Sequence, residues 1–159
     1  MPATAIFLYY MNHITTRQAN ISDLDFIAPL FDAYRQFYSK VPDLVGARNF
    51  ISHRISLNES VIFLVFKDDQ ALGFTQLYPS FSSVSMAKVF VLNDLYVIAA
   101  GRGQGVATAL LNAAAEYAKS VGAIRLNLNT DIRNTTAQSV YEAAGWVRDK
   151  HYYMYQLDL

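Results

Sequence analysis

Residues 94–108 read DLYVIAAGRGQGVAT, and this stretch decides how the rest of the chain is interpreted. An apolar, strand-like run ends in a loop with three glycines, and a helical pattern rich in Ala and Leu follows from about Gly105 to Val121. Glycine permits left-handed dihedrals and lets backbone N–H groups come close to a ligand. The helix has no side-chain cap, and its first carboxylate is Glu116. Its partly positive N-terminus, with Arg102 beside it, therefore favours a phosphate or pyrophosphate; a glycine-rich connection without a ligand is the alternative.

Three kinds of phosphate-binding loop compete for this pattern. A P-loop requires Lys followed by Ser or Thr after its last glycine, but Val106 and Ala107 stand there. The dinucleotide-binding fingerprint matches poorly in every frame, and no acidic residue ends a following strand at the expected distance. The hexapeptide RGQGVA at residues 102–107 instead resembles the Arg/Gln-x-x-Gly-x-Gly/Ala signature of the GNAT superfamily of N-acetyltransferases.

The resemblance implies that the loop and the helix end hold the pyrophosphate of acetyl-CoA, and that the preceding strand lies beside its thioester. The residues that it assigns to the cofactor are Leu95, Tyr96, Val97, Arg102, Gly103, Gln104, Gly105, Val106, Ala107 and Thr108.

A second motif lies at residues 134–146, NTTAQSVYEAAGW. Asn134 is a good helix N-cap and Gly145 a good left-handed terminator, so a helix is expected over about residues 135–144. Asn134 and Tyr141 fall on one helix face, about 10 Å apart along the axis. The segment is similar to the GNAT pattern Asn-x-x-Ala-x-x-x-Tyr-x-x-x-Gly-Phe/Trp. The resemblance implies that Asn134 bonds the pantetheine or phosphate region and that Tyr141 lies near the sulfur; a half-buried structural tyrosine is the alternative.

The composition indicates a well-packed globular chain without a strong electrostatic field. Of 159 residues, 53% are hydrophobic and 14% aromatic, which favours one domain with a proper core. Lys plus Arg and Asp plus Glu number 13 each, so no net charge recruits nucleic acid or an anionic membrane. There is no cysteine, which excludes disulfides, thiolate metal sites and an acyl-cysteine intermediate. The three histidines are scattered without ligand spacing, so no metal site is expected.

The expected organisation is an N-terminal extension of uncertain structure at 1–12 and a single acetyltransferase domain at 13–159. Residues 5–10 are apolar but too few to span a membrane, and no basic segment precedes them. We therefore expect a cytoplasmic protein.

The periodicities predict a mixed α/β (α+β) fold with the order β-α-α-β-β-β-α-β-α-β-β. The GNAT resemblance implies the same order and a GNAT-like fold. Its central twisted sheet is mixed but mostly antiparallel, with about six to seven strands flanked by about four helices. Ser22 to Asp25 predict a capping box, Asp43 predicts a cap for a second helix, and Asn93-Asp94 predict a bulge or a functional edge. The expected strands are 13–20, 61–66, 71–78, 86–97, 123–129, 146–149 and 151–157.

Attack of an amine on a thioester needs a base, donors for the developing oxyanion and a proton for the leaving thiolate. The strand Leu92–Val97 can supply backbone N–H donors where the bulge interrupts sheet pairing, and the resemblance implies that the thioester oxygen lies near Tyr96 and Val97. Tyr141 is our candidate proton donor. Asp94 is our candidate for removing the amine proton, directly or through a water; a bulge residue that bonds local backbone is the alternative. Without a cysteine or a Gly-x-Ser-x-Gly elbow, direct transfer from a ternary complex is preferred.

The acceptor is the least defined part of the site. The aromatic residues Tyr34, Tyr38, Tyr78 and Phe81 either belong to the core and its rim or line the pocket for a primary amine, which belongs to a small molecule or to a protein or peptide. The aromatic segment 151–155 is expected to lie under the sheet, with a homodimer contact as the alternative. A non-catalytic acyl-CoA-binding or regulatory module and a nucleotide-binding domain are the competing functions.

Overall fold

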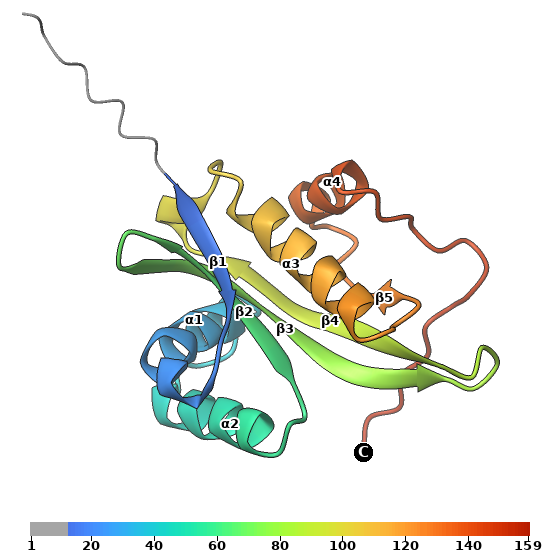
Figure 1. Ribbon diagram of the computed structural model, residues 1–159, viewed down its shortest axis with the longest axis horizontal. Helices are drawn as coiled ribbons and strands as arrows, with labels where there is room; N and C mark the ends of the chain where they lie inside the picture. Colours follow the sequence, from blue (N-terminus) through green and yellow to red (C-terminus); the bar gives the residue numbers. More distant parts are fainter. Residues whose placement is uncertain (1–12) are drawn as a thin grey trace, which may run out of the picture.

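The computed structural model describes residues 13–159, so the interpretation of residues 1–12 as an extension lies outside the described residues. Regular elements follow one another in the order shown in Figure 1. They are β1 (Ile14–Gln18), η1 (Ile21–Asp23), α1 (Leu24–Phe37), α2 (Leu44–Ser56), β2 (Val61–Lys67), β3 (Gln70–Ser82), β4 (Ala87–Val97), η2 (Ala99–Gly101), α3 (Val106–Ser120), β5 (Leu126–Asn127) and α4 (Thr135–Ala143).

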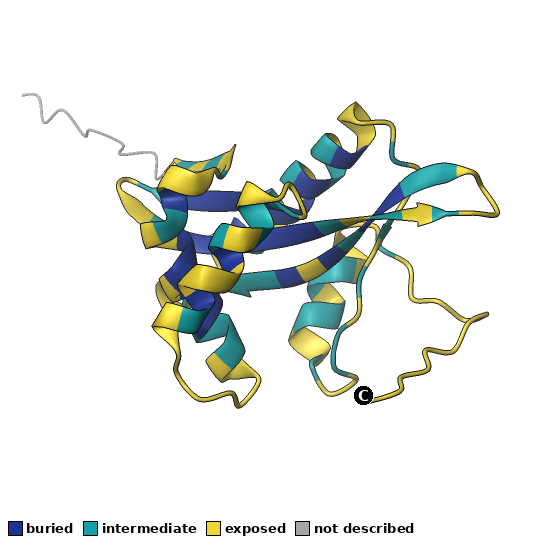
Figure 2. Cartoon of the chain, turned by 90° about the horizontal axis from the view of Figure 1, so that it is seen from below, coloured by how far each residue is buried: buried dark blue, intermediate teal, exposed yellow. Residues whose placement is uncertain are grey.

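The sheet has the order β1-β2-β3-β4-β5, with antiparallel pairs from β1 to β4 and a parallel pair between β4 and β5. Helices α1 and α2 cover one face, and α3 covers the other (Figure 1). The apolar run of β2 follows from this, because Leu64 packs toward α1 and α2 while Phe63 and Val65 pack toward α3. Figure 2 shows the buried residues gathered along the sheet and the inner helix faces. The expected mixed α/β, mostly antiparallel fold is confirmed.

The strand count is smaller than expected, five among residues 13–159 rather than six to seven. The strand expected at 123–129 is reduced to Leu126–Asn127, and residues 146–157 form no strand. The expectation that segment 151–155 lies under the sheet is wrong, since all five residues are exposed and Tyr153 is 90% exposed. The backbone of a strand needs a neighbouring edge. Here the N–H groups of His151 and Tyr152 bond the Asp149 carboxylate instead and form a local turn.

Helix caps lie close to where the residue types place them. Asp43 caps α2 by accepting a hydrogen bond from Gly46 N (2.8 Å), as expected. The predicted box at Ser22 to Asp25 is wrong by two residues, because Asn20 is the N-cap of η1 and Asp23 completes the box. Arg17 on β1 selects this register, since its guanidinium donates to both oxygens of Asp23 and lowers the pKa of that carboxyl.

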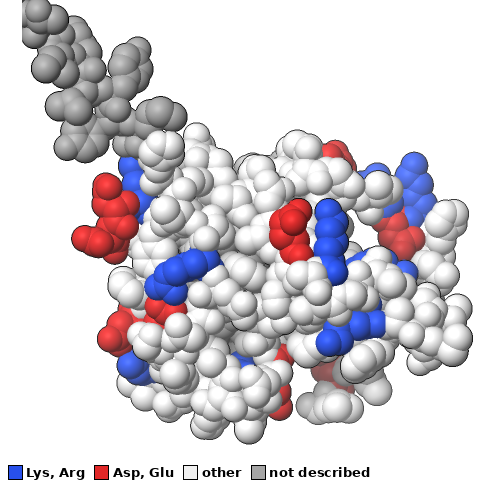
Figure 3. Space-filling model, in the orientation of Figure 1, with Lys and Arg blue, Asp and Glu red and all other residues white. Residues whose placement is uncertain are grey.

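The charged side chains are dispersed over the surface. On the face in Figure 3, Lys and Arg alternate with Asp and Glu, without a patch of one sign. Several of these charges lie in pairs, such as Arg48 with Asp25 and Arg133 with Asp131. Among residues 13–159, no helix is both long and apolar enough to cross a membrane.

Gly73 allows β3 to approach β4 closely beside the site. A Cβ there would lie 2.5 Å from the Tyr96 carbonyl oxygen and 3.2 Å from Val106 Cγ1. Gly73→Ala is therefore expected to lower the free energy of unfolding by about 1–3 kcal/mol, because a backbone atom cannot move aside cheaply. Urea denaturation of the two proteins measures the change.

Gly122→Ala is the matched control. That glycine has a φ of +74°, and a Cβ there meets no atom within 4 Å. Only backbone strain is added, at a cost of about 1 kcal/mol. Equal losses for the two variants would contradict the crowding at Gly73.

Candidate functional site

A cavity of about 600 Å³ opens where β4, the glycine loop and the first turn of α3 meet α1 and α4. Its lining is formed by Tyr34, Phe37, Tyr38, Leu95, Tyr96, Val97, Gly101, Arg102, Gly103, Gly105, Val106, Ala107, Thr108, Thr130, Asn134, Thr136, Ala137, Val140 and Tyr141. This volume is of the size usual for small-molecule sites. The two sequence motifs therefore face one cavity.

The glycine loop leaves the N-terminus of α3 open. Gly103 and Gly105 have φ values of +71° and +78°, and a Cβ at either position meets nothing within 4 Å. Gly105 is the N-cap of α3, with no side-chain cap and no acidic residue in the first turn. Gly101 has a different role, since a Cβ there would lie 3.1 Å from Leu72 Cβ. It is a packing glycine. The free N–H groups at the start of α3 form a cradle with the geometry and charge that a pyrophosphate requires.

Three polar side chains surround this cradle. Arg102 is exposed beside it and lines the cavity. Gln104, assigned to the cofactor by resemblance, has its amide turned back to the Ala100 carbonyl and lies outside the lining. Lys67 at the end of β2 donates to Gln104 Oε1 (3.0 Å) and adds a cation that the loop motif did not indicate. The pairing of β2 with β3 and of β3 with β4 brings Lys67 to the loop.

Helix α4 presents one face to the same cavity. Asn134 caps it, with Oδ1 accepting from Ala137 N (3.1 Å), so its side-chain oxygen is engaged and its amide NH₂ remains as the donor group. Gly145 has a φ of +85° and ends the helix as expected. Tyr141 is half-buried, with its ring 6.2 Å from that of Trp146. Burial raises the pKa of Tyr141 and keeps its hydroxyl protonated.

The edge of β4 diverges from its neighbour at the site. The parallel pairing with β5 ends at Val91, although β4 continues to Val97. Ile98 N donates to Leu72 O on the β3 side (2.9 Å), so the N–H and C=O groups of Val97 face the opposite edge, toward the cavity. Arg102 Nε donates to the Val97 carbonyl at 3.4 Å. Val97 thus offers a backbone donor to the cavity.

A bulge places Asp94 behind the cavity wall. Gln76 pairs with Asp94 and Leu77 with Leu92, so Asn93 is the extra residue, as the sequence predicts. Asp94 is 2% exposed and lies outside the lining. Its carboxylate accepts from Gln76 Nε2 (2.5 Å) and from Asn93 Nδ2 (3.0 Å). Burial raises the pKa of Asp94, and these hydrogen bonds offset part of that rise.

The aromatic residues divide into two groups. Tyr34 and Tyr38 line the cavity, together with Phe37. Tyr78 and Phe81 lie outside the lining, and Phe81 is 73% exposed. Tyr78 is half-buried; burial, and then the Asp94 carboxylate, raise the pKa of Tyr78 to about 12.

Several residues that line the cavity were not predicted from the sequence. Ala137 stands three residues after Asn134 and four before Tyr141, so helical spacing would have indicated it. Val140 and then Thr136 follow from it at the same spacings, on the adjoining face. The role of Gln76 could not be predicted from the sequence pattern, because its position opposite Asp94 depends on the register of β3 with β4.

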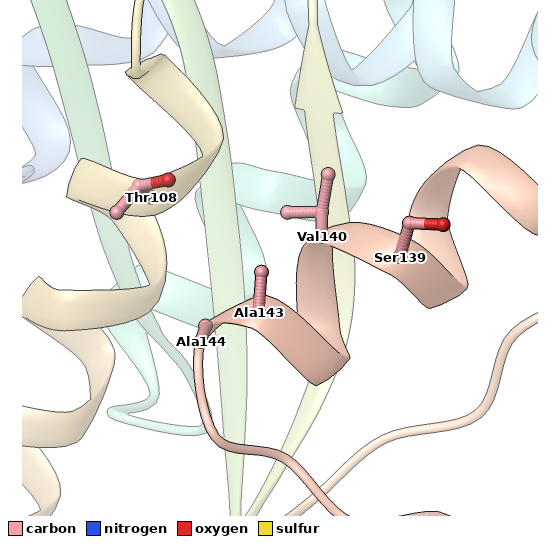
Figure 4. A pocket seen from close by; sticks show the side chains of 5 residues that line it. All are labelled: Thr108, Ser139, Val140, Ala143 and Ala144. Carbon is pink, nitrogen blue, oxygen red and sulfur yellow. The ribbon is translucent and has the colours of Figure 1, made fainter.

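A smaller hollow of about 250 Å³ lies between the first turns of α3 and the end of α4. Thr108 and Val140 line both this hollow and the main cavity. Figure 4 shows Thr108 on α3 opposite Val140 and Ala143 on α4, with Ala144 just past the end of α4 and the Ser139 hydroxyl pointing away. These side chains are small and mostly apolar, so this hollow separates the two helices without adding a reactive group. Among residues 13–159, no group of three His, Cys, Asp or Glu side chains is arranged to hold a metal ion.

Comparison with known proteins agrees with this geometry. The acetyltransferase (GNAT) family profile matches residues 27–146. The uncharacterized N-acetyltransferase YhfO of Bacillus subtilis (strain 168) is 45% identical over 143 residues, which are 90% of this chain and 96% of the relative. The crystal structure of a probable acetyltransferase is 41% identical, with a TM-score of 0.86, covering 91% of this chain and 97% of that one.

A more distant structure shares the fold alone. The aminoglycoside N-acetyltransferase AAC(6')-Iy, solved in complex with CoA, is 20% identical, with a TM-score of 0.77 and coverage of 92% and 96%. The family match over residues 27–146, together with the 45% identity to an N-acetyltransferase along nearly the whole chain, shows that this protein belongs to the GNAT family of acetyltransferases.

Proposed function

We propose that this protein transfers the acetyl group of acetyl-CoA directly to a primary amine, within a ternary complex. The observation that carries the proposal is the uncapped start of α3, which opens into the same cavity as Asn134 and Tyr141. The pyrophosphate would lie on the N–H groups at Gly105 and Val106, with Arg102 and Lys67 supplying positive charge. The Asn134 NH₂ would donate to the pantetheine arm.

When bound, acetyl-CoA supplies a thioester carbonyl beside β4. We place its oxygen against the Val97 N–H, which faces the cavity and has no pairing strand among the described residues. A backbone donor of this kind is already oriented, so it stabilises negative charge on the oxygen without rearrangement.

Tyr141 is our proton donor to the departing thiolate. Its raised pKa keeps the phenol protonated at neutral pH. Tyr141 lines the cavity, on the helix that Asn134 caps. A positioned donor of this kind suits a thiol with an ordinary pKa near 8.5.

Asp94 is our base for the amine. Gln76 and Asn93 fix both carboxylate oxygens. Tyr34 lines the cavity, and its hydroxyl donates to the carbonyl of the neighbouring Asn93 (3.3 Å). Because Asp94 is 2% exposed, we propose that the amine proton reaches it through a water. Its raised pKa makes Asp94 a stronger base than an exposed aspartate.

Asp94→Asn is expected to lower kcat/KM about a hundredfold at pH 7, because amide nitrogen and oxygen take up no proton. In the wild type, activity falls as the pH drops through the raised pKa of Asp94, since the protonated carboxyl is no base. The variant should lose this acidic limb. Asp69→Asn, on the exposed turn after β2, is the matched control and should keep the wild-type profile. An unchanged acidic limb in Asp94→Asn would remove Asp94 from the mechanism.

Gln76→Leu is expected to move that acidic limb to higher pH. The Gln76 hydrogen bond lowers the pKa of Asp94, so its loss raises that pKa further and protonates the base earlier as the pH falls. Leucine fills a similar volume, and the Gln76 Oε1 that it removes has no hydrogen-bond partner. A pH–rate profile measures the shift; a limb at the wild-type pH would show that Gln76 does not act on Asp94.

Release of free CoA in the presence of an amine panel tests the proposed function. We expect turnover with at least one amine and an increase of the melting temperature on adding acetyl-CoA. Stabilisation by acetyl-CoA without release of CoA would favour a non-catalytic acyl-CoA-binding module. Equal stabilisation by ATP or NAD would favour a nucleotide-binding domain.

A further inference from the structure

The part of the cavity lining contributed by the end of α1 and by Tyr96 on β4 is built from aromatic rings. The Tyr34 ring lies 5.1 Å from the Tyr38 ring, edge to face, and 6.5 Å from the Tyr96 ring on β4. The Phe37 ring lies 5.3 Å from that of Tyr38. The rings of Tyr34, Phe37, Tyr38 and Tyr96 form what we call the aromatic wall. Tyr38 is also close enough to Tyr141 to raise the pKa of Tyr141, so the wall adjoins our proton donor. The acceptor amine would meet this wall when it reaches the thioester.

This wall holds no free negative charge. Among the described residues that line the cavity, Arg102 has the only charged side chain, and it lies at the glycine-loop end. The Asp94 carboxylate is buried, and both of its oxygens are hydrogen-bonded. Asp32 of α1 is 6% exposed and accepts from Arg35, Gln36 and Asp43 N. A second ammonium group in the cavity would find no counter-charge and would lose its hydration.

Aromatic rings favour an amine that carries one ammonium group and a flat apolar group. An arriving ammonium is attracted to the faces of tyrosine rings, and a flat apolar group stacks on them. The cavity volume of about 600 Å³ must also hold the pantetheine end of acetyl-CoA, which leaves room for a small acceptor.

From this aromatic wall and its lack of a free carboxylate, we infer that the acceptor is a small aryl-alkyl monoamine. Polycations and protein amines are then poor acceptors. This inference rests on the proposed acetyl transfer. The amino group would lie near Tyr34 and Tyr38, with the aromatic group against Phe37 and Tyr96.

Steady-state CoA release with four acceptors tests the inference: 2-phenylethylamine, n-hexylamine, spermidine and a lysine-containing peptide. We expect kcat/KM for 2-phenylethylamine to exceed that for spermidine and for the peptide about tenfold or more, with n-hexylamine between them. A higher value for spermidine or the peptide, or n-hexylamine equal to 2-phenylethylamine, would overturn the acceptor class.

Two variants test the wall itself. Tyr38→Ala, at the exposed end of α1, is expected to raise KM for 2-phenylethylamine about tenfold, with KM for acetyl-CoA unchanged. Tyr152→Ala, in the exposed segment after α4, is the matched control and should behave as the wild type. Phe37→Asp adds a carboxylate and should shift the kcat/KM ratio of spermidine to 2-phenylethylamine about fivefold toward spermidine. If Tyr38→Ala leaves KM for the amine unchanged, or Phe37→Asp leaves the ratio unchanged, the wall does not select the acceptor.

The failure of this inference is distinguishable from failure of the proposed function. If acetyl-CoA raises the melting temperature but 2-phenylethylamine is not acetylated, the acceptor class is wrong while the CoA site stands. If acetyl-CoA neither stabilises the protein nor releases CoA with any amine, the proposed function is wrong, and this inference with it.

Discussion

Gly105→Glu is expected to abolish acetyl-CoA binding, with Kd raised about a hundredfold or more. The φ of +78° strains any residue with a Cβ, and the new side chain would enter the open space where nothing lies within 4 Å of that Cβ. Its carboxylate would occupy the N-terminus of α3 in place of the pyrophosphate and repel it. Isothermal titration with acetyl-CoA measures Kd, and the shift of melting temperature with ligand gives an independent value.

Gly122→Glu is a closely matched control, because it is the same substitution at the opposite end of the same helix. Gly122 has a φ of +74°, is exposed, and also has no atom within 4 Å of a Cβ. It should lose a similar amount of stability and bind acetyl-CoA normally. Normal binding by Gly105→Glu would show that the loop does not hold the pyrophosphate.

Tyr141→Phe is expected to lower kcat about a thousandfold with little change in the affinity for acetyl-CoA. Phenylalanine keeps the ring packed near Trp146 and removes only the hydroxyl, so the fold and the cavity are retained. The loss falls on kcat because the proton is needed as the thiolate leaves. Steady-state kinetics with a saturating amine, together with the Kd of acetyl-CoA, separate the two effects.

Tyr117→Phe tests whether the loss is specific to the site. Tyr117 is a half-buried tyrosine on α3 that packs against Phe63 and Phe90 at the sheet, outside the cavity lining. We expect wild-type kcat for this variant. If both variants lose turnover equally, the effect comes from packing; if Tyr141→Phe keeps full turnover, Tyr141 is not the proton donor.

Local features of the site were readable from residue types. The glycines at 103 and 105, the absent cap of α3, the Asn134 cap and the Gly145 terminator all depend on backbone groups within a few residues. The same holds for the bulge, since two polar residues interrupted an apolar strand at Asn93 and Asp94. The two motifs together were also sufficient to identify the family, which the comparisons confirm.

Other features depended on contacts between distant parts of the chain. The aromatic pattern of residues 151–157 predicted a strand, but β propensity makes no strand without a paired edge, and these residues are exposed. Whether Tyr34 or Tyr78 lines the cavity could not be decided from composition either. Tyr34 reaches the cavity from α1, whereas Tyr78 on β3 lies beside the buried Asp94.

The amino-acid sequence by itself determined the glycine loop, the bare start of α3 and the Asn134-to-Tyr141 helix face, because helix ends and turns are governed by hydrogen bonds between near neighbours. Only the tertiary structure decided that Gln76 faces Asp94, that Lys67 reaches the loop, and that Tyr34, Phe37 and Tyr38 line the cavity, whose described lining includes no carboxylate. Those features follow from strand register and helix packing, which bring together residues that lie far apart in the chain.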